Sequence, residues 1–178
     1  MNRQIFYSVL LIIAVFIGFN ALATDNIAST KSRYAPADAS LAWAAFAGGC
    51  FGCVEAGFEK IPGVVETVSG YSGGDEKNPN YKQVASGATG HTEAVQVYYD
   101  PEKTDYETLA KIFFETHDPG QLNRQGPDIG TQYRSEIFYL NDEQMTIAEK
   151  LVAQLKEKGI SVVTAITEAT EFWDAEVY

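Results

Sequence analysis

Cysteine, histidine and positive charge are all scarce in this chain of 178 residues. Two cysteines cannot form the multi-disulfide framework on which small secreted domains rely. The 13 basic residues are outnumbered by 24 acidic residues, which gives a formal net charge of -11. Because so negative a surface repels phosphate backbones, we expect no nucleic-acid partner.

The chain also lacks an apolar run long enough for an ordinary membrane span. Residues 5–19 are almost wholly apolar, but 15 residues fall short of the roughly 20 that a spanning helix needs. Arg3 precedes this run, and Ala21-Leu22-Ala23 follows it with the small-residue pattern of a cleavage site. We therefore predict a secretory signal peptide over residues 1–23 and an exported protein, periplasmic or secreted. An uncleaved membrane anchor is the alternative interpretation.

Residues 24–40, rich in Ala, Ser, Thr and Asp, are predicted to be a flexible lead-in. No Pro/Gly/Ser-rich linker and no repeat interrupts residues 41–178, so we expect one domain there. Hydrophobic periodicity predicts its elements. The expected strands cover residues 41–47, 64–71, 92–99, 133–140 and 160–167, and the expected helices cover 51–61, 105–117 and 141–159.

The predicted order is β-α-β-β-α-β followed by α-β. Its first six elements match the ferredoxin-like arrangement, an α+β two-layer sandwich in which helices cover one face of a mixed sheet. A doubly wound parallel fold would need a helix between residues 64–71 and 92–99, where only a turn-rich loop is expected.

The two cysteines stand three residues apart, as Cys50-Phe51-Gly52-Cys53. Cys50 lies where a predicted strand ends and a helix begins, and the positive end of the helix dipole favours a thiolate there. Gly48-Gly49 would let a substrate approach the sulfur without meeting side chains. Cys53, one turn later, is close enough to attack whatever forms on Cys50.

Three interpretations of this pair remain open on spacing alone: a redox pair, a structural disulfide and part of a metal site. A structural disulfide would explain the cysteines but not the adjacent glycines. Zinc needs about four ligands, and only His91 and His117 could join the cysteines. A redox pair fits the surroundings best.

A series of short motifs in fixed order then resembles the A-type peptide methionine sulfoxide reductases. The blocks cover nearly all of residues 43–178, and such a series is far more specific than any single motif. They are Gly48-Gly49-Cys50-Phe51 with Glu55, Gly70-Tyr71-Ser72-Gly73-Gly74, Asn78-Pro79-Asn80-Tyr81, Gly90-His91-Thr92-Glu93, His117-Asp118-Pro119, Leu122-Asn123-Arg124-Gln125-Gly126 and Asp128-Ile129-Gly130-Thr131-Gln132-Tyr133-Arg134-Ser135.

The resemblance implies repair of oxidised proteins by thiol-dependent reduction of the S epimer of methionine sulfoxide, free or in proteins. It makes Cys50 the nucleophile, Glu93 the acid that protonates the oxygen, and Tyr81 and Tyr133 its hydrogen-bonding partners. Asp128 matches an aspartate that holds a water or orients the site. The implied intermediate on Cys50 is a sulfenic acid, which Cys53 condenses with to form a disulfide.

The same resemblance implies no bound metal or organic cofactor, an external dithiol such as a thioredoxin-like protein as reductant, and a monomer. Two rival functions are a general thiol–disulfide oxidoreductase, although a thioredoxin-like strand order is absent, and a binding module for methionine-containing peptides.

Two departures from the family pattern matter. The family usually has Gly-Cys-Phe-Trp, where Phe and Trp wall the pocket for the S-methyl group; here Phe51 is kept and Gly52 replaces Trp. We expect weaker substrate capture with the chemistry retained. Residues 175–178 resemble the point where the family continues with a His-Gln-x-Tyr stretch and a tail that often carries recycling cysteines. Either the C-terminus is truncated or the tail is dispensable, and Cys53 is then the candidate resolving thiol.

Overall fold

The structure, a computed structural model, describes residues 31–176. The predicted signal peptide and the first part of the predicted lead-in, residues 24–30, lie outside these residues. Among residues 31–176, no helix has the length and apolar character needed to cross a membrane. In chain order the elements are β1 (Ala42–Gly48), α2 (Phe51–Phe58), β2 (Val64–Ser72), α3 (Tyr81–Ala85), β3 (Thr92–Tyr99), α4 (Tyr106–Thr116), β4 (Arg124–Gln125), β5 (Asp128–Ile129), the 3-10 helix η1 (Thr131–Tyr133), β6 (Ser135–Tyr139), α5 (Asp142–Glu157), β7 (Ala165–Glu168) and β8 (Trp173–Asp174).

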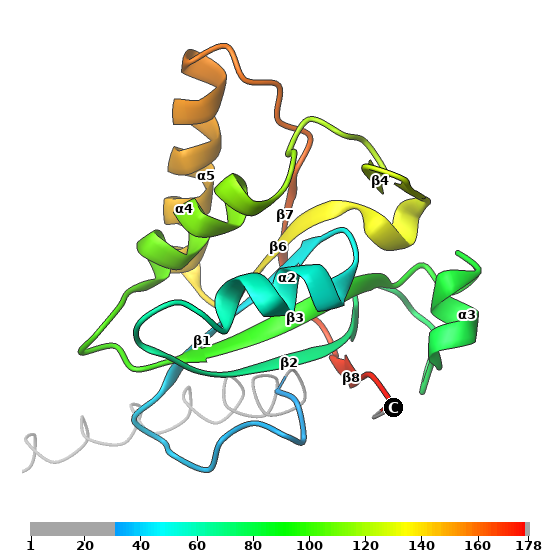
Figure 1. Ribbon diagram of the computed structural model, residues 1–178, viewed down its shortest axis with the longest axis horizontal. Helices are drawn as coiled ribbons and strands as arrows, with labels where there is room; N and C mark the ends of the chain where they lie inside the picture. Colours follow the sequence, from blue (N-terminus) through cyan, green and yellow to red (C-terminus); the bar gives the residue numbers. More distant parts are fainter. Residues whose placement is uncertain (1–30, 177–178) are drawn as a thin grey trace, which may run out of the picture.

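Six strands form one sheet in the order β7-β6-β1-β3-β2-β8 (Figure 1). Only the β6–β7 pair is parallel, and the other pairs are antiparallel. β1 and β3 are central, with Phe46 opposite Val95 and Ala42 opposite Tyr99. The fold is therefore a mixed α+β architecture with a mostly antiparallel sheet.

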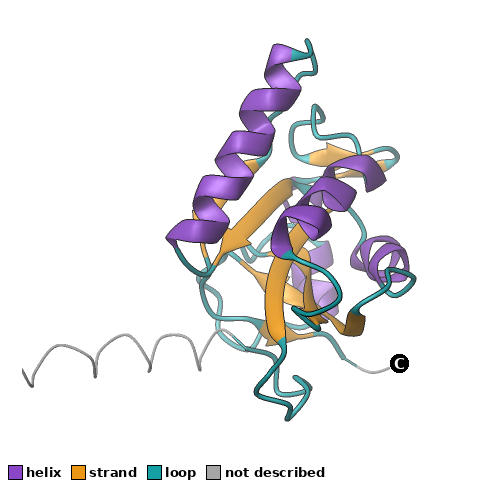
Figure 2. Cartoon of the chain, turned by 90° about the vertical axis from the view of Figure 1, so that its left-hand side faces the viewer, coloured by secondary structure: helices purple, strands orange, loops and turns teal. Residues whose placement is uncertain are grey.

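The two faces of the sheet bury different cores. On one face, alternate residues of the central strands, such as Phe46 and Val97, pack against α2, α4 and α5. On the other, Trp43 and Tyr98 pack with Phe172 from the segment that leads into β8. Figure 2 shows the long helix α5 beside the strands. Helices thus cover one face, whereas irregular segments cover the other.

Most predicted elements are confirmed within a few residues. Asp105 and Asn141 cap α4 and α5, each accepting a hydrogen bond from the backbone N–H three residues later. The prediction for residues 160–167 is wrong over its first half, because β7 starts only at Ala165 and the chain before it is irregular. α3, β8 and the short β4–β5 hairpin were not predicted.

The described end of the predicted lead-in is held against the sheet. The Ser32 N–H donates to Oε1 of the buried Gln96 at 2.9 Å, and the Ser32 hydroxyl donates to Asp174. The Arg33 guanidinium pairs with the same carboxylate at 3.1 Å. The N-terminal segment therefore helps to fix β8 at the edge of the sheet.

Candidate functional site

Cys50 occupies the junction between β1 and α2. Its backbone dihedrals, φ -58° and ψ 121°, are non-helical, and its carbonyl accepts hydrogen bonds from the amides of Cys53 at 3.1 Å and Val54 at 3.3 Å. It is thus the N-cap residue of α2, where unpaired amides and the helix dipole favour a negative charge. Its side chain is half-buried, that of Cys53 is exposed, and both are free thiols.

The pKa of the Cys53 thiol is raised. A negative charge on Cys50 is the largest cause, followed by partial burial and a hydrogen bond between the two side chains. Asp128 and Glu93 add smaller effects in the same direction. The raised pKa favours the protonated thiol of Cys53, so Cys50, at the start of the helix, is the candidate nucleophile of the pair.

Glu93 lies on β3 with its side chain on the helix-covered face. It is only 2% exposed, and its Oε2 accepts a hydrogen bond of 2.9 Å from the backbone N–H of Phe51, the first residue of α2. Burial raises the pKa of Glu93, the bond from Phe51 opposes this shift, and the charge of Asp128 adds to it. The net effect is upward, so a carboxyl group that can carry a proton lies beside the start of the helix that Cys50 caps.

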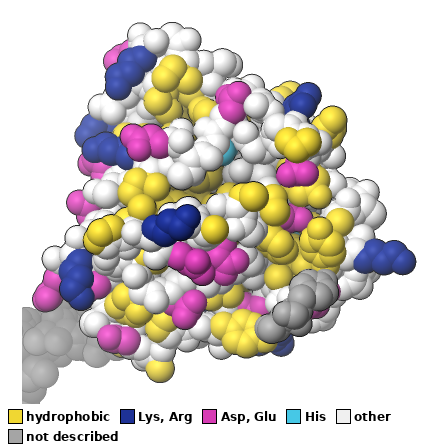
Figure 3. Space-filling view, viewed as in Figure 1, with side chains coloured by type: hydrophobic (Ala, Val, Ile, Leu, Met, Phe, Trp, Pro, Cys, Tyr) yellow, Lys and Arg dark blue, Asp and Glu magenta, His cyan; other side chains and the backbone are white. Residues whose placement is uncertain are grey.

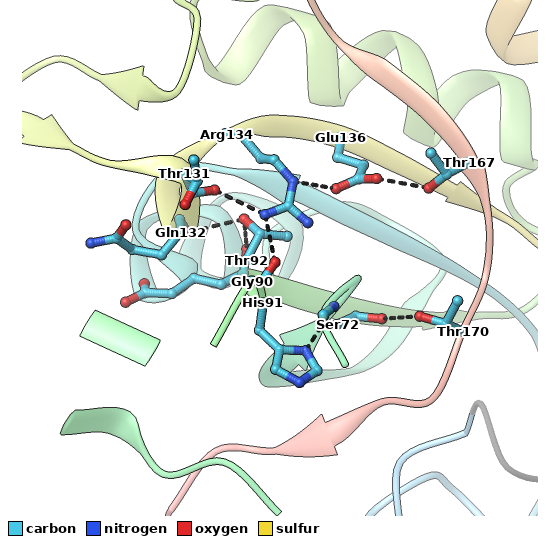
Figure 4. A network of polar contacts seen from close by, with 12 residues as sticks. Ser72, Gly90, His91, Thr92, Thr131, Gln132, Arg134, Glu136, Thr167 and Thr170 are labelled. Carbon is cyan, nitrogen blue, oxygen red and sulfur yellow. Dashed lines mark hydrogen bonds and ion pairs between the residues drawn. The ribbon is translucent and has the colours of Figure 1, made fainter. Parts of the chain in front are cut away.

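The segment that carries Tyr133 is tied to β3 and α3 by buried polar contacts (Figure 4). The Thr92 hydroxyl donates to the backbone carbonyl of Gln132 at 3.0 Å, and the Gln132 side-chain amide donates to the carbonyl of Ala85 at 2.9 Å. Thr92 and Gln132 are the sequence neighbours of Glu93 and Tyr133. These bonds therefore hold the tyrosine next to the buried carboxyl.

Arg134 strengthens the same connection. Its Nη1 donates to the carbonyls of Gly90, at 3.1 Å, and Thr131, at 3.0 Å (Figure 4). Its Nε pairs with the buried Glu136 at 2.7 Å, and the other oxygen of Glu136 accepts a bond from Thr167 at 2.7 Å. The Arg134 guanidinium thus joins the loop before β3 and the 3-10 helix η1 to Glu136 of β6, and Glu136 in turn bonds to β7.

Tyr133 and Asp128 belong to the same electrostatic cluster as the thiols. Desolvation raises the pKa of the half-buried Tyr133, and Glu93, Tyr81, Asp128 and Cys50 raise it further. A phenol held in its protonated form can donate a hydrogen bond to an oxygen that gains negative charge. The structure therefore brings together all six residues expected to carry the chemistry: Cys50, Cys53, Tyr81, Glu93, Asp128 and Tyr133.

Phe51 lies between two other aromatic rings. Its centroid is 6.0 Å from that of the fully buried Tyr71 and 6.2 Å from that of the partly exposed Tyr81, with which it is stacked. In Figure 3, apolar side chains gather on the face between α2 and α3, with acidic groups among them. The three rings form an apolar wall beside Cys50.

Gly52 follows Phe51 at an exposed position of α2. A Cβ added there would have no heavy atom within 4 Å, so the first atom of a larger side chain would meet open space. The wall expected from Phe51 is present, and its expected partner is absent.

The interpretation of Gly48-Gly49 as an approach route to the sulfur is wrong. A Cβ at Gly48 would come within 2.9 Å of the Phe113 ring and 3.2 Å of the His117 ring. At Gly49, φ is +103° and a Cβ would lie 2.7 Å from Gln125. Glycine is needed here because neighbouring side chains occupy the space and the backbone is left-handed.

Both histidines have structural contacts. His91 accepts from the Gly74 N–H at 3.1 Å through Nδ1, and its Nε2 lies 2.8 Å from the Glu76 carbonyl, to which it donates. His117 has its Nδ1 2.7 Å from the Phe113 carbonyl and its Nε2 2.6 Å from the Ser135 hydroxyl. Within residues 31–176, no three His, Cys, Asp or Glu side chains are placed to hold a metal ion.

Comparison with known proteins decides the family. The family model described as peptide methionine sulfoxide reductase matches residues 42–178. The chain belongs to this family. It is a peptide-methionine (S)-S-oxide reductase, an oxidoreductase whose function is thiol-dependent reduction of methionine sulfoxide.

Individual relatives support this assignment. The chain is 59% identical to peptide methionine sulfoxide reductase MsrA 1 of Rhodopirellula baltica over 136 residues, which cover 76% of the chain and 71% of the relative. It is 52% identical to the MsrA of Pasteurella multocida over 136 residues, with 76% and 78% coverage. Each alignment covers more than two thirds of both proteins.

Solved structures of the family share the fold. Reduced Mxr1 of Saccharomyces cerevisiae superposes with a TM-score of 0.80 at 34% identity, covering 84% of this chain and 88% of that one. Methionine sulfoxide reductase A of Corynebacterium diphtheriae has a TM-score of 0.70 at 35% identity, with 79% and 72% coverage. Mxr1 has also been solved in complex with Trx2; that structure is 24% identical and has a TM-score of 0.63, with 83% and 91% coverage.

Sequence reasoning missed the residues that support the site rather than react. Gln132 and Arg134 had been noted only as parts of a motif, and Glu176 only as part of the chain end. No local pattern marks them, because each acts on a segment distant in sequence: Gln132 on Ala85, Arg134 on Gly90 and Glu176 on Tyr81.

The raised pKa of Glu93 predicts a pH-dependent stability difference. The folded protein holds this proton more tightly than the unfolded chain, whose pKa is near 4.5. The resulting stabilisation is fully present below pH 4.5 and is lost as the pH rises through the folded pKa. The free energy of unfolding of the wild type should therefore fall, relative to that of Glu93→Gln, as the pH rises from 4.5 to 8.

Urea unfolding of both proteins at several pH values measures this difference. The control is Glu115→Gln, a change at an exposed position of α4, whose unfolding free energy should follow that of the wild type. A constant difference between wild type and Glu93→Gln across this range would show that Glu93 titrates normally.

Proposed function

We propose that Cys50 attacks the sulfoxide sulfur and that Glu93 supplies the proton its oxygen needs in order to leave. Tyr81 and Tyr133 donate hydrogen bonds to that oxygen, Asp128 orients the site, and Phe51 contacts the substrate's apolar part beside Gly52. The observation that supports this most is the 2.9 Å bond between the Glu93 carboxyl and the Phe51 N–H, because it places the buried acid at the helix start that Cys50 caps.

In the first step, two electrons pass from the Cys50 sulfur to the sulfoxide sulfur of the substrate. The Cys50 thiolate forms a bond to the sulfoxide sulfur, and the oxygen takes the proton of Glu93. Collapse of this adduct releases methionine and leaves Cys50 as a sulfenic acid. The substrate sulfur is reduced by two electrons, and the Cys50 sulfur is oxidised by two.

In the second step, Cys53 resolves the sulfenic acid. Its sulfur attacks Cys50, water leaves, and a Cys50–Cys53 disulfide forms. A thioredoxin-like dithiol is the proposed reductant that returns both thiols, and no bound cofactor takes part. The exposure of Cys53 supports this order, since a reductant must reach one sulfur of the disulfide.

Single-turnover reduction of S-epimer methionine sulfoxide tests these two steps. Pre-reduced wild type should release one equivalent of methionine and lose both thiols. Cys53→Ser should release the same equivalent at a similar rate, because Cys50 and Glu93 are unchanged, and should lose its single thiol as a sulfenic acid. Loss of only one thiol in the wild type would remove Cys53 from the mechanism. No methionine from folded, reduced protein would favour the peptide-binding module instead.

The open space at Gly52 predicts that an aromatic side chain there improves substrate capture. Gly52→Trp should lower KM by about tenfold to about a hundredfold with kcat changed much less, since burying a large apolar side chain contributes about 1.5–3 kcal/mol. Steady-state kinetics should be compared with Gly52→Ala, which adds only a methyl group to the same helix position. Equal KM values in the three proteins would show that this position does not contact the substrate.

We propose two further features of the protein. The strand order β6-β1-β3-β2 with antiparallel pairing supports a ferredoxin-like description of the core, and an experimental structure with another order would overturn it. The enzyme is proposed to act as a monomer on free or protein-bound methionine sulfoxide of the S epimer.

Export is proposed from residues 1–23 of the sequence. Expression of the full chain in a Gram-negative host should give a periplasmic protein whose N-terminal residue is Thr24, as determined by fractionation and mass spectrometry. An intact N-terminus on protein in the cytoplasmic fraction would contradict both cleavage and export, and an intact N-terminus in the membrane fraction would favour the anchor.

A further inference from the structure

Glu176, just beyond β8, uses both carboxylate oxygens at the edge of the site. Oε1 accepts a hydrogen bond of 2.9 Å from the backbone N–H of Tyr81. Oε2 accepts a hydrogen bond of 2.9 Å from the hydroxyl of Tyr71. One side chain therefore joins the first residue of α3 to a buried residue of β2, positions that are 95 and 105 residues away along the chain.

These two tyrosines are the rings on either side of Phe51. The Tyr71 and Tyr81 centroids lie 6.0 Å and 6.2 Å from that of Phe51, and the carboxylate of Glu176 bonds to both residues of this aromatic wall, to the hydroxyl of Tyr71 and to the backbone of Tyr81. Tyr81 lies at the start of a helix of only five residues, which has little stability of its own. Its position therefore depends on tertiary contacts such as this bond.

The segment that leads to Glu176 is fixed by backbone and side-chain contacts. β8 pairs with β2 at Gly70 and Tyr71, and the Ala175 N–H donates to the Ser69 carbonyl at 3.0 Å. Asp174, two residues before Glu176, accepts the hydrogen bonds from Ser32 and pairs with Arg33. Glu176 therefore extends from a segment tied to the edge strand of the sheet and can hold the short helix α3 in place.

We propose that Glu176 is a positioning residue for the substrate site, which holds Tyr81 and Tyr71 against Phe51 so that the sulfoxide side chain meets a preformed wall. This inference rests on the proposed function only in taking the sulfoxide side chain to be the molecule that contacts the wall. Its effect is on capture and orientation of the substrate rather than on the reactivity of the Cys50 sulfur.

The ionised carboxylate accepts from both partners at once. Desolvation would raise the pKa of Glu176, but the hydrogen bonds from the backbone N–H groups of Tyr81 and of Glu176 itself and from the Tyr71 hydroxyl outweigh it and hold the pKa below its ordinary value. Glutamine of the same shape has one acceptor oxygen and an amide that only donates. Because the Tyr71 hydroxyl can also accept, Glu176→Gln can keep both contacts, but only with the Tyr71 bond reversed and without the negative charge that strengthens both bonds.

Steady-state kinetics of Glu176→Gln provide the first test. We expect KM for methionine sulfoxide to rise about tenfold, because neutral hydrogen bonds replace two charge-assisted ones, with a smaller change in kcat. The rate of Cys50 alkylation by iodoacetamide should stay within twofold of the wild type. The matched control is Glu171→Gln in the same C-terminal segment, whose carboxylate pairs with the exposed Lys77 and which should leave KM unchanged.

Amide hydrogen exchange tests the contact itself, independently of activity. Exchange of the Tyr81 amide should be at least several-fold faster in Glu176→Gln, whereas that of Gln83, whose N–H donates to the Asn80 side chain, should be unchanged. Faster exchange at Tyr81 with a raised KM supports the proposal. An unchanged KM with active wild type overturns it, as does an unchanged Tyr81 exchange rate. Inactive wild type would overturn the proposed function, and the exchange rates would still decide whether Glu176 holds Tyr81.

Discussion

The site depends on one hydrogen bond, which joins the buried Glu93 carboxyl to the first amide of α2. A carboxyl group that is 2% exposed would be costly without a donor, and an amide at a helix start has no partner within the helix. The amide gives the carboxyl its hydrogen-bond donor, and the carboxyl gives the amide its acceptor. This bond holds β3 against the start of α2, where Cys50 is the N-cap residue. The bond lowers the pKa of Glu93, but burial outweighs it, so the carboxyl can hold a proton beside the start of α2.

The remaining groups are brought to this point by side chains that bond to distant backbone. Gln132 reaches the carbonyl of Ala85, Thr92 reaches the carbonyl of Gln132, and Arg134 reaches the carbonyl of Gly90. Such contacts hold segments that are not part of the six-stranded sheet. They allow Tyr133 and Asp128 to lie on a 3-10 turn and a two-residue strand and still belong to a defined site.

The sequence predicted the elements whose stability is local or periodic. Alternation defines β3, and side-chain caps define the starts of α4 and α5, so these were predicted within a residue or two. α3 and β8 were missed because five and two residues give no periodicity; an Asn80 capping box and pairing with β2 stabilise them. Ile160 and Val163 have β-branched side chains typical of a strand, yet they are exposed, and pairing with β6 begins only at Ala165.

The residues proposed to react could be predicted because they lie in motifs that retain the family order. The residues that hold them in place could not be predicted in this way. Cys50 and Glu93 were named from such motifs. In the structure, Cys50 caps α2, and Glu93 of β3 accepts a hydrogen bond from the first residue of that helix. Glu176 is one acid among 24, and nothing near it in sequence marks its partners. Its function follows only from a fold that brings the last strand beside the second.

Gly52, between the two cysteines, is where this site differs from the family pattern. A Cβ there would meet no heavy atom within 4 Å, and the neighbouring Cys53 is exposed. In the proposed mechanism, the missing aromatic side chain reduces apolar contact with a substrate and leaves Cys53 accessible to the dithiol that reduces the disulfide. The apolar contact that remains comes from Phe51, Tyr71 and Tyr81, and because there is no second wall, substrate capture depends on how firmly these three rings are held.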